Sequence, residues 1–269
     1  MTEHHGVREP RFPPGTFTPA PGPGRIGRML LTHARVETSL TLRHGEQVLL
    51  TLLIPLALLV GLSLLDVVPT GAGPGVARVD AVTPRILALA VLSSAFTGQA
   101  IALGFDRRYG VLKRLSATAL PRWLLVAGRL TAALVVVALQ AAVLAAVAFA
   151  LGWSPSPAGI ALAVPLLVLG TLTFGALGVL LGGALRAEAV LAVANIVWFV
   201  LLLAGGIILA PSALPGSMGA VVSLLPSAAL AEGLHAALVH GEFSWSTLLP
   251  LLAWGGAAAA LATRTTKLT

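Results

Sequence analysis

The amino-acid sequence predicts an all-α membrane protein with six transmembrane helices, an N-terminal amphipathic interfacial helix and a re-entrant helical hairpin after helix five. Composition is the first reason: 57% of the 269 residues are hydrophobic and only 10% are charged, whereas soluble domains carry about 25% charged residues. The second reason is length, because six apolar segments can each cross roughly 30 Å of hydrocarbon. The third is the placement of Lys and Arg, which gather in connectors on one predicted side of the membrane.

The N-terminal region precedes the first apolar segment. Residues 1–25 are polar and rich in proline, so we expect a disordered cytoplasmic tail. Residues 26–46 then show helical periodicity, with an apolar side that His33 and Glu37 interrupt. The other side carries the arginines that an interfacial helix would turn toward anionic lipid headgroups, namely Arg28, Arg35 and Arg43. A solvated linker is the alternative interpretation of this segment.

The transmembrane domain is expected to occupy residues 26–262. Its predicted spans lie near residues 47–65, 86–104, 124–151, 160–185, 189–210 and 246–262. In the fourth span, Gly178 and Gly182 form a GxxxG pair, which lets two helix backbones approach closely, within one chain or between two. The few polar residues inside the spans are expected to hydrogen-bond between helices rather than to contact a substrate; they are Thr97, Gln99, Gln140, Thr171, Thr173 and Asn195.

The basic residues set the predicted orientation. With the N-terminus in the cytoplasm, 15 of the 17 Lys and Arg residues fall on the cytoplasmic side, and only Arg78 and Arg85 lie outside. The opposite orientation would contradict the positive-inside rule. An even number of spans returns the tail at residues 263–269 to the cytoplasm. The sequence therefore predicts a multi-pass protein with both termini in the cytoplasm.

The segment from Pro211 to Ser244 is apolar but interrupted by prolines and glycines. Two short helices fit within it, at residues 218–225 and 227–238, and we expect them to form the re-entrant hairpin on the outer side, shielded by protein. A seventh full span is the alternative. Several carboxylates and imidazoles gather in this segment, but their spacing does not predict a metal site; they are Glu232, His235, His240 and Glu242.

The connector between the second and third spans is densely charged. From Phe105 to Trp123 it reads FDRRYGVLKRLSATALPRW and holds five of the 17 Lys and Arg residues. It opens with a charged turn at residues 106–110 and continues as a short helix at residues 111–115 with one apolar and one basic side. Such a loop either only fixes the orientation of the protein or docks a cytoplasmic partner. We favour the docking interpretation.

The sequence lacks recognisable catalytic motifs. It contains no Walker G-x-x-x-x-G-K-[ST] loop, no H-E-x-x-H and no G-x-S-x-G, so we expect no enzyme activity, no ATP hydrolysis and no cofactor or metal bound by this chain. The predicted spans hold no Asp, Glu or Lys, the groups on which proton- or sodium-coupled carriers usually depend, and Arg129 lies near enough to the inner edge to reach it. The net charge of +7 follows from the positive-inside pattern, and no nucleic-acid partner is expected.

A family resemblance rests on residues 105–129, FDRRYGVLKRLSATALPRWLLVAGR, which combine a charged pair, a glycine, a Leu-Lys-Arg-Leu run and a proline before the third span. With the apolar hairpin and its Leu-Leu-Pro at residues 224–226, this order of parts resembles the permease subunits of ABC-2 type exporters, a group that contains antibiotic-resistance and polysaccharide or teichoic-acid exporters. The resemblance covers nearly all of the chain after residue 25. It implies a bacterial plasma-membrane protein that moves a lipophilic or amphiphilic substrate outward, such as a drug, an antibiotic or a lipid.

The resemblance also implies partners. Two permease chains would pair, as a homodimer or as related chains, and each would bind a separate ATPase that carries ATP and Mg. The ATPase would push on residues 105–115 and on the interfacial helix, and the substrate would leave through a lateral opening between spans one and five. The implied coupling residues are Asp106, Arg107 and Arg108 for polar contacts with the ATPase, Tyr109 and Leu112 for filling its groove, Gly110 for the turn, and Lys113 and Arg114.

Two other classes of function stay open at this point. A channel or secondary carrier would show transport without ATP, and a scaffold that assembles a membrane complex would show no transport. A gene for an ATPase with a Walker motif beside the gene for this chain would favour the exporter over both.

Overall fold

The computed structural model describes residues 25–43, 45–65, 75–116, 121–211, 214–215 and 217–265. Within these ranges every regular element is helical and no strand is present. The protein is therefore an all-α membrane protein, as predicted. The predicted disordered tail at residues 1–25 lies outside the described residues except for Arg25, and so do residues 266–269 of the predicted C-terminal tail.

The chain begins with α1 (Ile26–Arg43), and six helical stretches then correspond to the six predicted spans. They are α2 (Gly45–Leu64), the continuous run of α3 (Arg78–Val91), the π-helix η1 (Leu92–Gly98) and α4 (Gln99–Arg108), and then α6 (Arg122–Ala150), α7 (Pro157–Ala184), α8 (Ala187–Leu203) and α11 (Trp245–Thr265). Four of them are long and apolar enough to cross a membrane, whereas α2 and α8 contribute shorter apolar helices. The count of six spans therefore stays a prediction.

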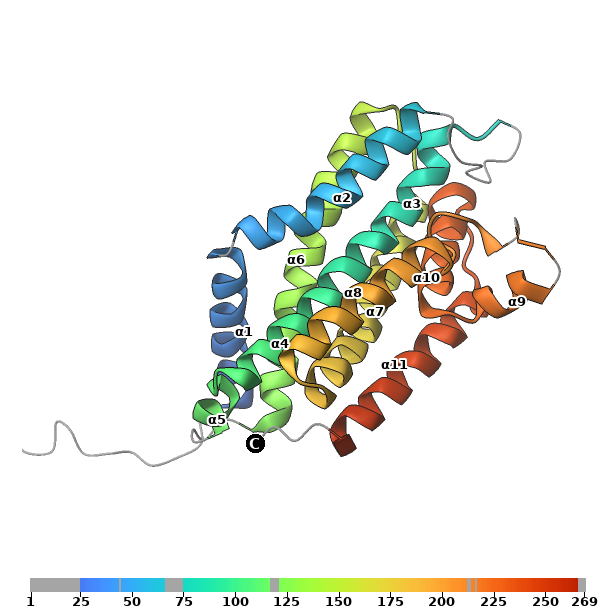
Figure 1. Ribbon diagram of the computed structural model, residues 1–269. Helices are drawn as coiled ribbons and strands as arrows, with labels where there is room; N and C mark the ends of the chain where they lie inside the picture. The colour runs from blue at the N-terminus through green and yellow to red at the C-terminus, as the bar shows by residue number, and fades with distance from the viewer. Residues whose placement is uncertain are drawn as a thin grey trace, which may run out of the picture.

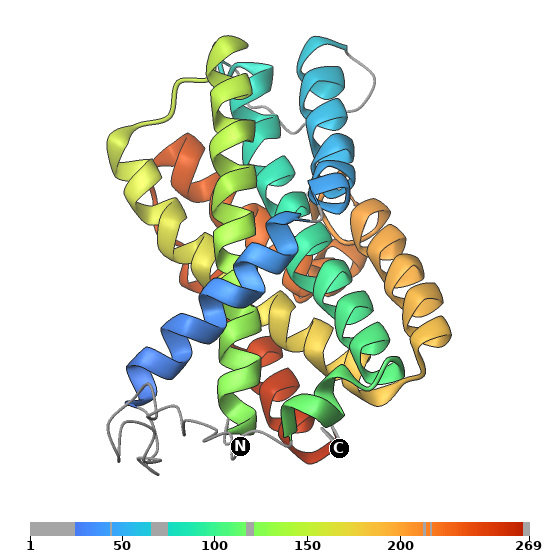
Figure 2. The same cartoon turned by 90° about the vertical axis from the view of Figure 1, so that its left-hand side faces the viewer.

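These helices alternate in direction along the bundle (Figure 1). We call one end the basic end, because the end of α4, the short helix α5 (Val111–Ser116) and the end of α11 lie there (Figure 2). The second predicted span is the central helix, since it contacts α2, α6, α7, α8 and α10 and is the most deeply buried of the four long helices. Because of these contacts, a displacement of the central helix at the basic end can be transmitted to most of the bundle.

A bent pair of helices follows α8 where the re-entrant hairpin was predicted. It consists of α9 (Ser217–Ser223) and the continuous run of α10 (Pro226–His235) and the π-helix η3 (Ala236–His240), and the two parts meet at 89°. The α10 part is buried and packs against α3, α7 and α11. Pro226 lies in the first turn of α10, where a backbone N–H would have no partner within the helix. Proline, which lacks that N–H, is therefore well suited to this position. We call the opposite end of the bundle, near this pair, the hairpin end.

The two glycines of the GxxxG pair lie where α7 crosses the central helix. A Cβ atom at Gly178 would come within 2.7 Å of the carbonyl oxygen of Phe96, and one at Gly182 within 2.5 Å of the carbonyl oxygen of Ala100. Real Cβ atoms are essentially never found that close to another heavy atom. The pair thus permits close packing within the chain, against η1 and α4, which is one of the two arrangements that the sequence leaves open.

Replacing Gly182 with valine is expected to destabilise the bundle by about 1–3 kcal/mol, because the added carbons must push α7 away from α4. Gly256 offers a matched control, since it lies in α11 with nothing within 4 Å of a Cβ at its position. Thermal unfolding of the purified protein in detergent measures the difference. Equal unfolding temperatures for Gly182→Val and Gly256→Val would show that the α7–α4 crossing is looser than the structure indicates.

Candidate functional site

The last turn of α4 carries three consecutive charged residues, and each reaches a different helix. Asp106 forms an ion pair with Arg129 of α6. Arg107 donates through Nη1 to the carbonyl oxygens of Gly182 and Leu185, at 3.0 and 3.1 Å. Arg108 forms an ion pair with Glu188 of α8. Because α4 continues to Arg108, these residues belong to a helix and not to the turn that the sequence predicts.

The partners of the two arginines lie at helix ends, where unpaired backbone groups attract charge. The last carbonyls of α7 have no partner within their own helix, so the Arg107 guanidinium satisfies them and suits the negative end of that helix dipole. Glu188 lies in the first turn of α8, the positive end. The tight α7–α8 connection therefore packs against α4 through two arginines.

The connector turns at Tyr109 and Gly110 and continues as α5. Gly110 has φ +69°, a left-handed conformation that glycine adopts readily, so it allows the chain to turn here. Tyr109 is 64% exposed and its ring lies 6.1 Å from that of Phe105. Lys113 and Arg114 are exposed as well.

Two coupling residues lie elsewhere than the resemblance implies. Leu112 is 4% exposed and packs with Leu103 of α4 and Val179 of α7, so it cannot fill a groove on another protein without leaving this contact. Asp106 faces Arg129 and a pocket inside the chain, whereas the resemblance implies a polar contact with an ATPase. The ATPase-coupling role of the eight residues stays a prediction.

A shallow groove of about 480 Å³ runs between the connector and the α7–α8 turn at the basic end. Its charged lining consists of Arg107, Arg108, Lys113, Arg186 and Glu188. The side chains of Arg108 and Glu188 are 51% and 66% exposed, so their ion pair is open to solvent. We call this groove, together with the exposed Tyr109 and Arg114 of the connector, the connector surface; it is predominantly basic.

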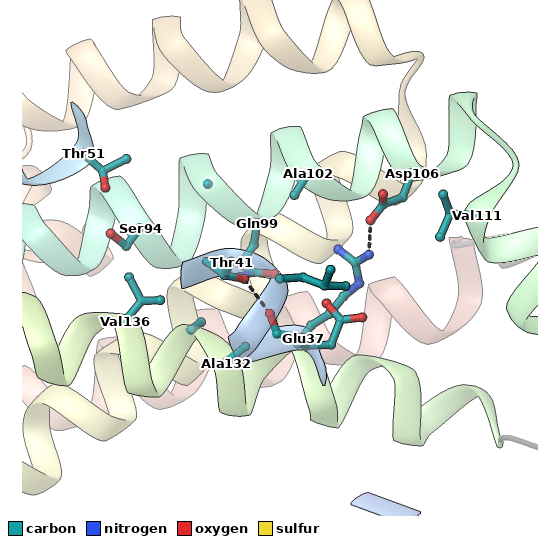
Figure 3. A pocket seen from close by; sticks show the side chains of 14 residues that line it. Glu37, Thr41, Thr51, Ser94, Gln99, Ala102, Asp106, Val111, Ala132 and Val136 are labelled. Atoms are coloured by element: carbon teal, nitrogen blue, oxygen red, sulfur yellow. Dashed lines mark hydrogen bonds and ion pairs between the residues drawn. The ribbon is translucent and has the colours of Figure 1, made fainter. Parts of the chain in front are cut away.

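A second, more enclosed pocket of about 260 Å³ lies behind the connector, between α1, α2, α4, α5 and α6 (Figure 3). Asp106 and Val111 lie toward one end of it and Thr51 and Ser94 toward the other (Figure 3). The remaining polar lining includes Glu37, Thr41, Gln99 and Arg129. A pocket that combines these groups with apolar walls suits a small amphiphile better than a bare ion.

Thr51 and Ser94, at one end of this pocket, belong to a hydrogen-bonded network that joins three helices. Gln140 of α6 is fully buried; its Nε2 donates to Thr51 Oγ1 at 3.0 Å, and its Oε1 accepts from Ser94 Oγ at 2.6 Å. The neighbouring Ser93 accepts from Trp198 Nε1 of α8 at 2.9 Å. The π-helix η1, which holds both serines, is thereby tied to α6 and α8, as expected for polar residues that bond between helices.

The other polar residues of the spans differ in their contacts. Thr173 Oγ1 donates to the carbonyl of Leu251 in α11 at 3.1 Å, a bond between helices. Thr171 and Asn195 instead donate to carbonyls of their own helices. Gln99 lines the pocket, and Thr97 Oγ1 is buried with no hydrogen-bond partner among the described residues.

One wall of the pocket is formed by α1, which crosses α6 obliquely (Figure 2). The side of α1 against α6 carries His33, Ala34 and Glu37, and the His33 ring lies directly over Gly128. Arg28, Arg35 and Arg43 are exposed, and Arg35 and Arg43 border an open groove between α1 and α6. Glu37 and His33 are among the site residues that sequence analysis missed, although both stood out as polar residues on an apolar helix side.

The described residues contain no group of three or more His, Cys, Asp or Glu side chains that would hold a metal ion. His235 and His240 of the hairpin have ring centroids 5.5 Å apart, and Glu232 pairs with Arg85. The charged groups at the hairpin end thus form no such group, and the expectation of no resident metal remains a prediction.

Comparison with known proteins identifies the family. The family described as "ABC-2 type transporter" matches residues 28–239, which include most of α1, the connector, the pocket and nearly all of the bent helix pair. No curated protein matches the chain significantly. Members of this family are integral membrane permeases that work with an ABC ATPase and are not themselves catalytic. The protein therefore belongs to the ABC-2 type transporter family and is a transmembrane permease subunit.

Proposed function

We propose that this permease exports a lipophilic or amphiphilic substrate, driven by a separate ATPase that binds the connector surface and carries ATP and Mg. In this proposal the basic end faces the cytoplasm of a bacterium, both termini lie there, and the protein spans the plasma membrane six times. A second permease chain, identical or related, completes the transporter. The arginines of α1 contact anionic lipid headgroups.

The observation that carries the proposal is the way α4 ends. Its last turn is joined to α6, α7 and α8 by Asp106, Arg107 and Arg108, and α5 follows directly on the connector surface. A force applied to α5 would therefore move four helices together. The basic surface suits an ATPase groove with acidic residues, since complementary charge favours the correct partner.

The substrate class is supported by what surrounds the pocket. The pocket lies beside α2, whose exposed side chains are large and apolar, and α8 carries a similar exposed row. These rows would face lipid or the second permease chain. An amphiphile could then pass from the bilayer to the pocket without crossing a charged barrier, whereas an ion would lose its hydration at high cost.

The test uses an ATPase co-expressed with the permease, preferably one encoded beside it. We expect Tyr109→Ala and Arg114→Glu each to reduce ATPase co-purification by about tenfold, because a partner of roughly micromolar affinity loses one contact at its binding surface. Both residues are exposed, so thermal stability should be unchanged. Export of a fluorescent phospholipid from proteoliposomes should fall in parallel.

Arg264→Glu is the matched control, since Arg264 is an exposed arginine at the end of α11, outside the connector. It should leave co-purification near the wild-type level. Undiminished co-purification in Tyr109→Ala and Arg114→Glu would refute docking on the connector surface. Export without ATP would favour a channel or carrier, and the absence of any transport with a bound ATPase would favour a scaffold.

A further inference from the structure

Arg85 is a charged side chain buried within the central helix. It lies two turns into α3 and is 5% exposed. Its Nη2 lies 3.4 Å from Glu232 Oε1 of α10. Its Nε and Nη1 are buried and have no hydrogen-bond partner among the described residues. Two of the three guanidinium nitrogens are therefore unsatisfied.

The surroundings of Arg85 on one side are apolar. A crevice between α2, α3 and the end of α8 is lined by Arg85 together with Leu58, Leu62, Ile86, Leu202 and Ile207. Its volume is about 10 Å³, room for about one water molecule. In this state the crevice is closed, and the walls that close it come from α2 and from the segment that follows α8.

Burying an arginine whose N–H groups lack hydrogen-bond partners costs free energy, so a protein keeps such a residue only where it has a function. Charged groups in membrane helices are retained where they bind something. The guanidinium is built for two parallel bonds to a carboxylate or phosphate, at about 2.7–2.9 Å, whereas Glu232 makes one contact at 3.4 Å. The side chain of Glu232 is 35% exposed, whereas the side chain of Arg85 is 6% exposed. The carboxylate can therefore leave the ion pair more readily than the guanidinium.

We propose that Arg85 binds the anionic headgroup of an amphiphile, a phosphate or a carboxylate, whose chain enters the apolar crevice between α2 and α8. Glu232 is the internal occupant that the headgroup replaces. Replacement frees α10 from its ion pair with α3, so binding at this site loosens the hairpin end of the bundle. The assignment of this amphiphile as cargo rests on the exporter function proposed above; the binding site itself does not.

The test uses the purified permease alone in neutral maltoside micelles, with dodecyl phosphate that carries a diazirine next to the phosphate. We expect photo-crosslinks to peptides around residues 58–62 and 202–208. The yield should fall about tenfold in Arg85→Gln, the loss of one bidentate charged contact. It should rise above wild type in Glu232→Gln, because the competing carboxylate is gone, and a misfolded protein cannot produce that gain.

Arg108→Gln is the matched control: it removes the same charge from the other end of the central helix, where Arg108 forms an exposed ion pair with Glu188. Its yield should stay near wild type, and the trimethylammonium analogue should not compete. Equal yields in wild type, Arg85→Gln and Glu232→Gln would overturn the proposal. Competition by an equal concentration of inorganic phosphate would also overturn it, by showing a site for free anions.

The assay involves neither an ATPase nor transport, so its outcome is separate from that of the exporter proposal. Loss of ATPase binding at the connector surface would leave the crosslinks unchanged. Absence of the crosslinks would refute the binding site at Arg85. The exporter proposal would then still hold, but for substrates without an anionic group.

Discussion

Replacing Asp106 with alanine is expected to lower the free energy of unfolding by about 2–3 kcal/mol. The change leaves Arg129, whose side chain is 7% exposed, without its carboxylate partner. Breaking a fully buried ion pair costs roughly 3–5 kcal/mol, and we expect less here because the Asp106 side chain is 30% exposed and borders a pocket. Chemical or thermal unfolding of the purified permease measures the loss.

The double variant Asp106→Asn with Arg129→Gln should recover most of this stability, since two neutral amides can still hydrogen-bond. Arg108→Ala is the control within the same turn: its ion pair with Glu188 is exposed on both sides, so it should cost less than about 1 kcal/mol. If Asp106→Ala proved as stable as Arg108→Ala, yet lost the ATPase, Asp106 would contact the partner protein directly and not Arg129.

Replacing Gly128 with leucine is expected to separate α1 from α6. A Cβ atom at Gly128 would lie 2.1 Å from His33 Cδ2, so a larger side chain must displace the histidine ring and the helix that carries it. The pocket would lose the wall that holds Glu37, and we expect export to fall by about tenfold or more, the effect of roughly 1.4 kcal/mol. The rest of the bundle should remain folded.

Spin labels on α1 and α6, at Arg35 and Leu139, would report the separation directly, and the absence of native cysteine leaves no background labelling. Gly61→Leu in α2 is the matched control, because nothing lies within 4 Å of a Cβ there. Gly128→Ala combined with His33→Ala should behave more like wild type than Gly128→Ala alone. An unchanged label distance in Gly128→Leu would contradict the packing of α1 described above.

The sequence predicted the helices well because their signal is local. Apolar length identifies a membrane helix, and a Gly–Pro-rich connection marks its end. The partners of the connector were beyond such reasoning: Gly182, Leu185 and Glu188 lie more than 70 residues from Arg107 and Arg108, and no local pattern shows which helix end a cation will meet. The sequence therefore indicated a charged loop without showing that three of its charges are used inside the chain.

The prediction for α1 identified its two sides but not the contacts that each would make. Periodicity separates apolar from polar positions, and in a soluble protein the apolar side would pack inward. In a membrane protein lipid covers apolar surface equally well, so small and polar residues are left for contacts between helices. That is why His33, Ala34 and Glu37 face α6, while Val36 and Leu40 are exposed.

The π-helix η1 has a consequence for how the chain tolerates insertions and deletions. A π-helical turn accommodates an extra residue within a helix, and each residue of an α-helix turns the chain by about 100°. Deleting one residue between Leu92 and Gly98 so that η1 becomes α-helical would preserve the apolarity of the span. Because a π turn covers about the same rotation as an α turn with one residue more, α4 would keep its orientation and Asp106 would still face Arg129. A gap of one residue at η1 therefore leaves the charges that meet at the basic end in place, whereas a gap of one residue in an α-helical part of the span would turn them by about 100°.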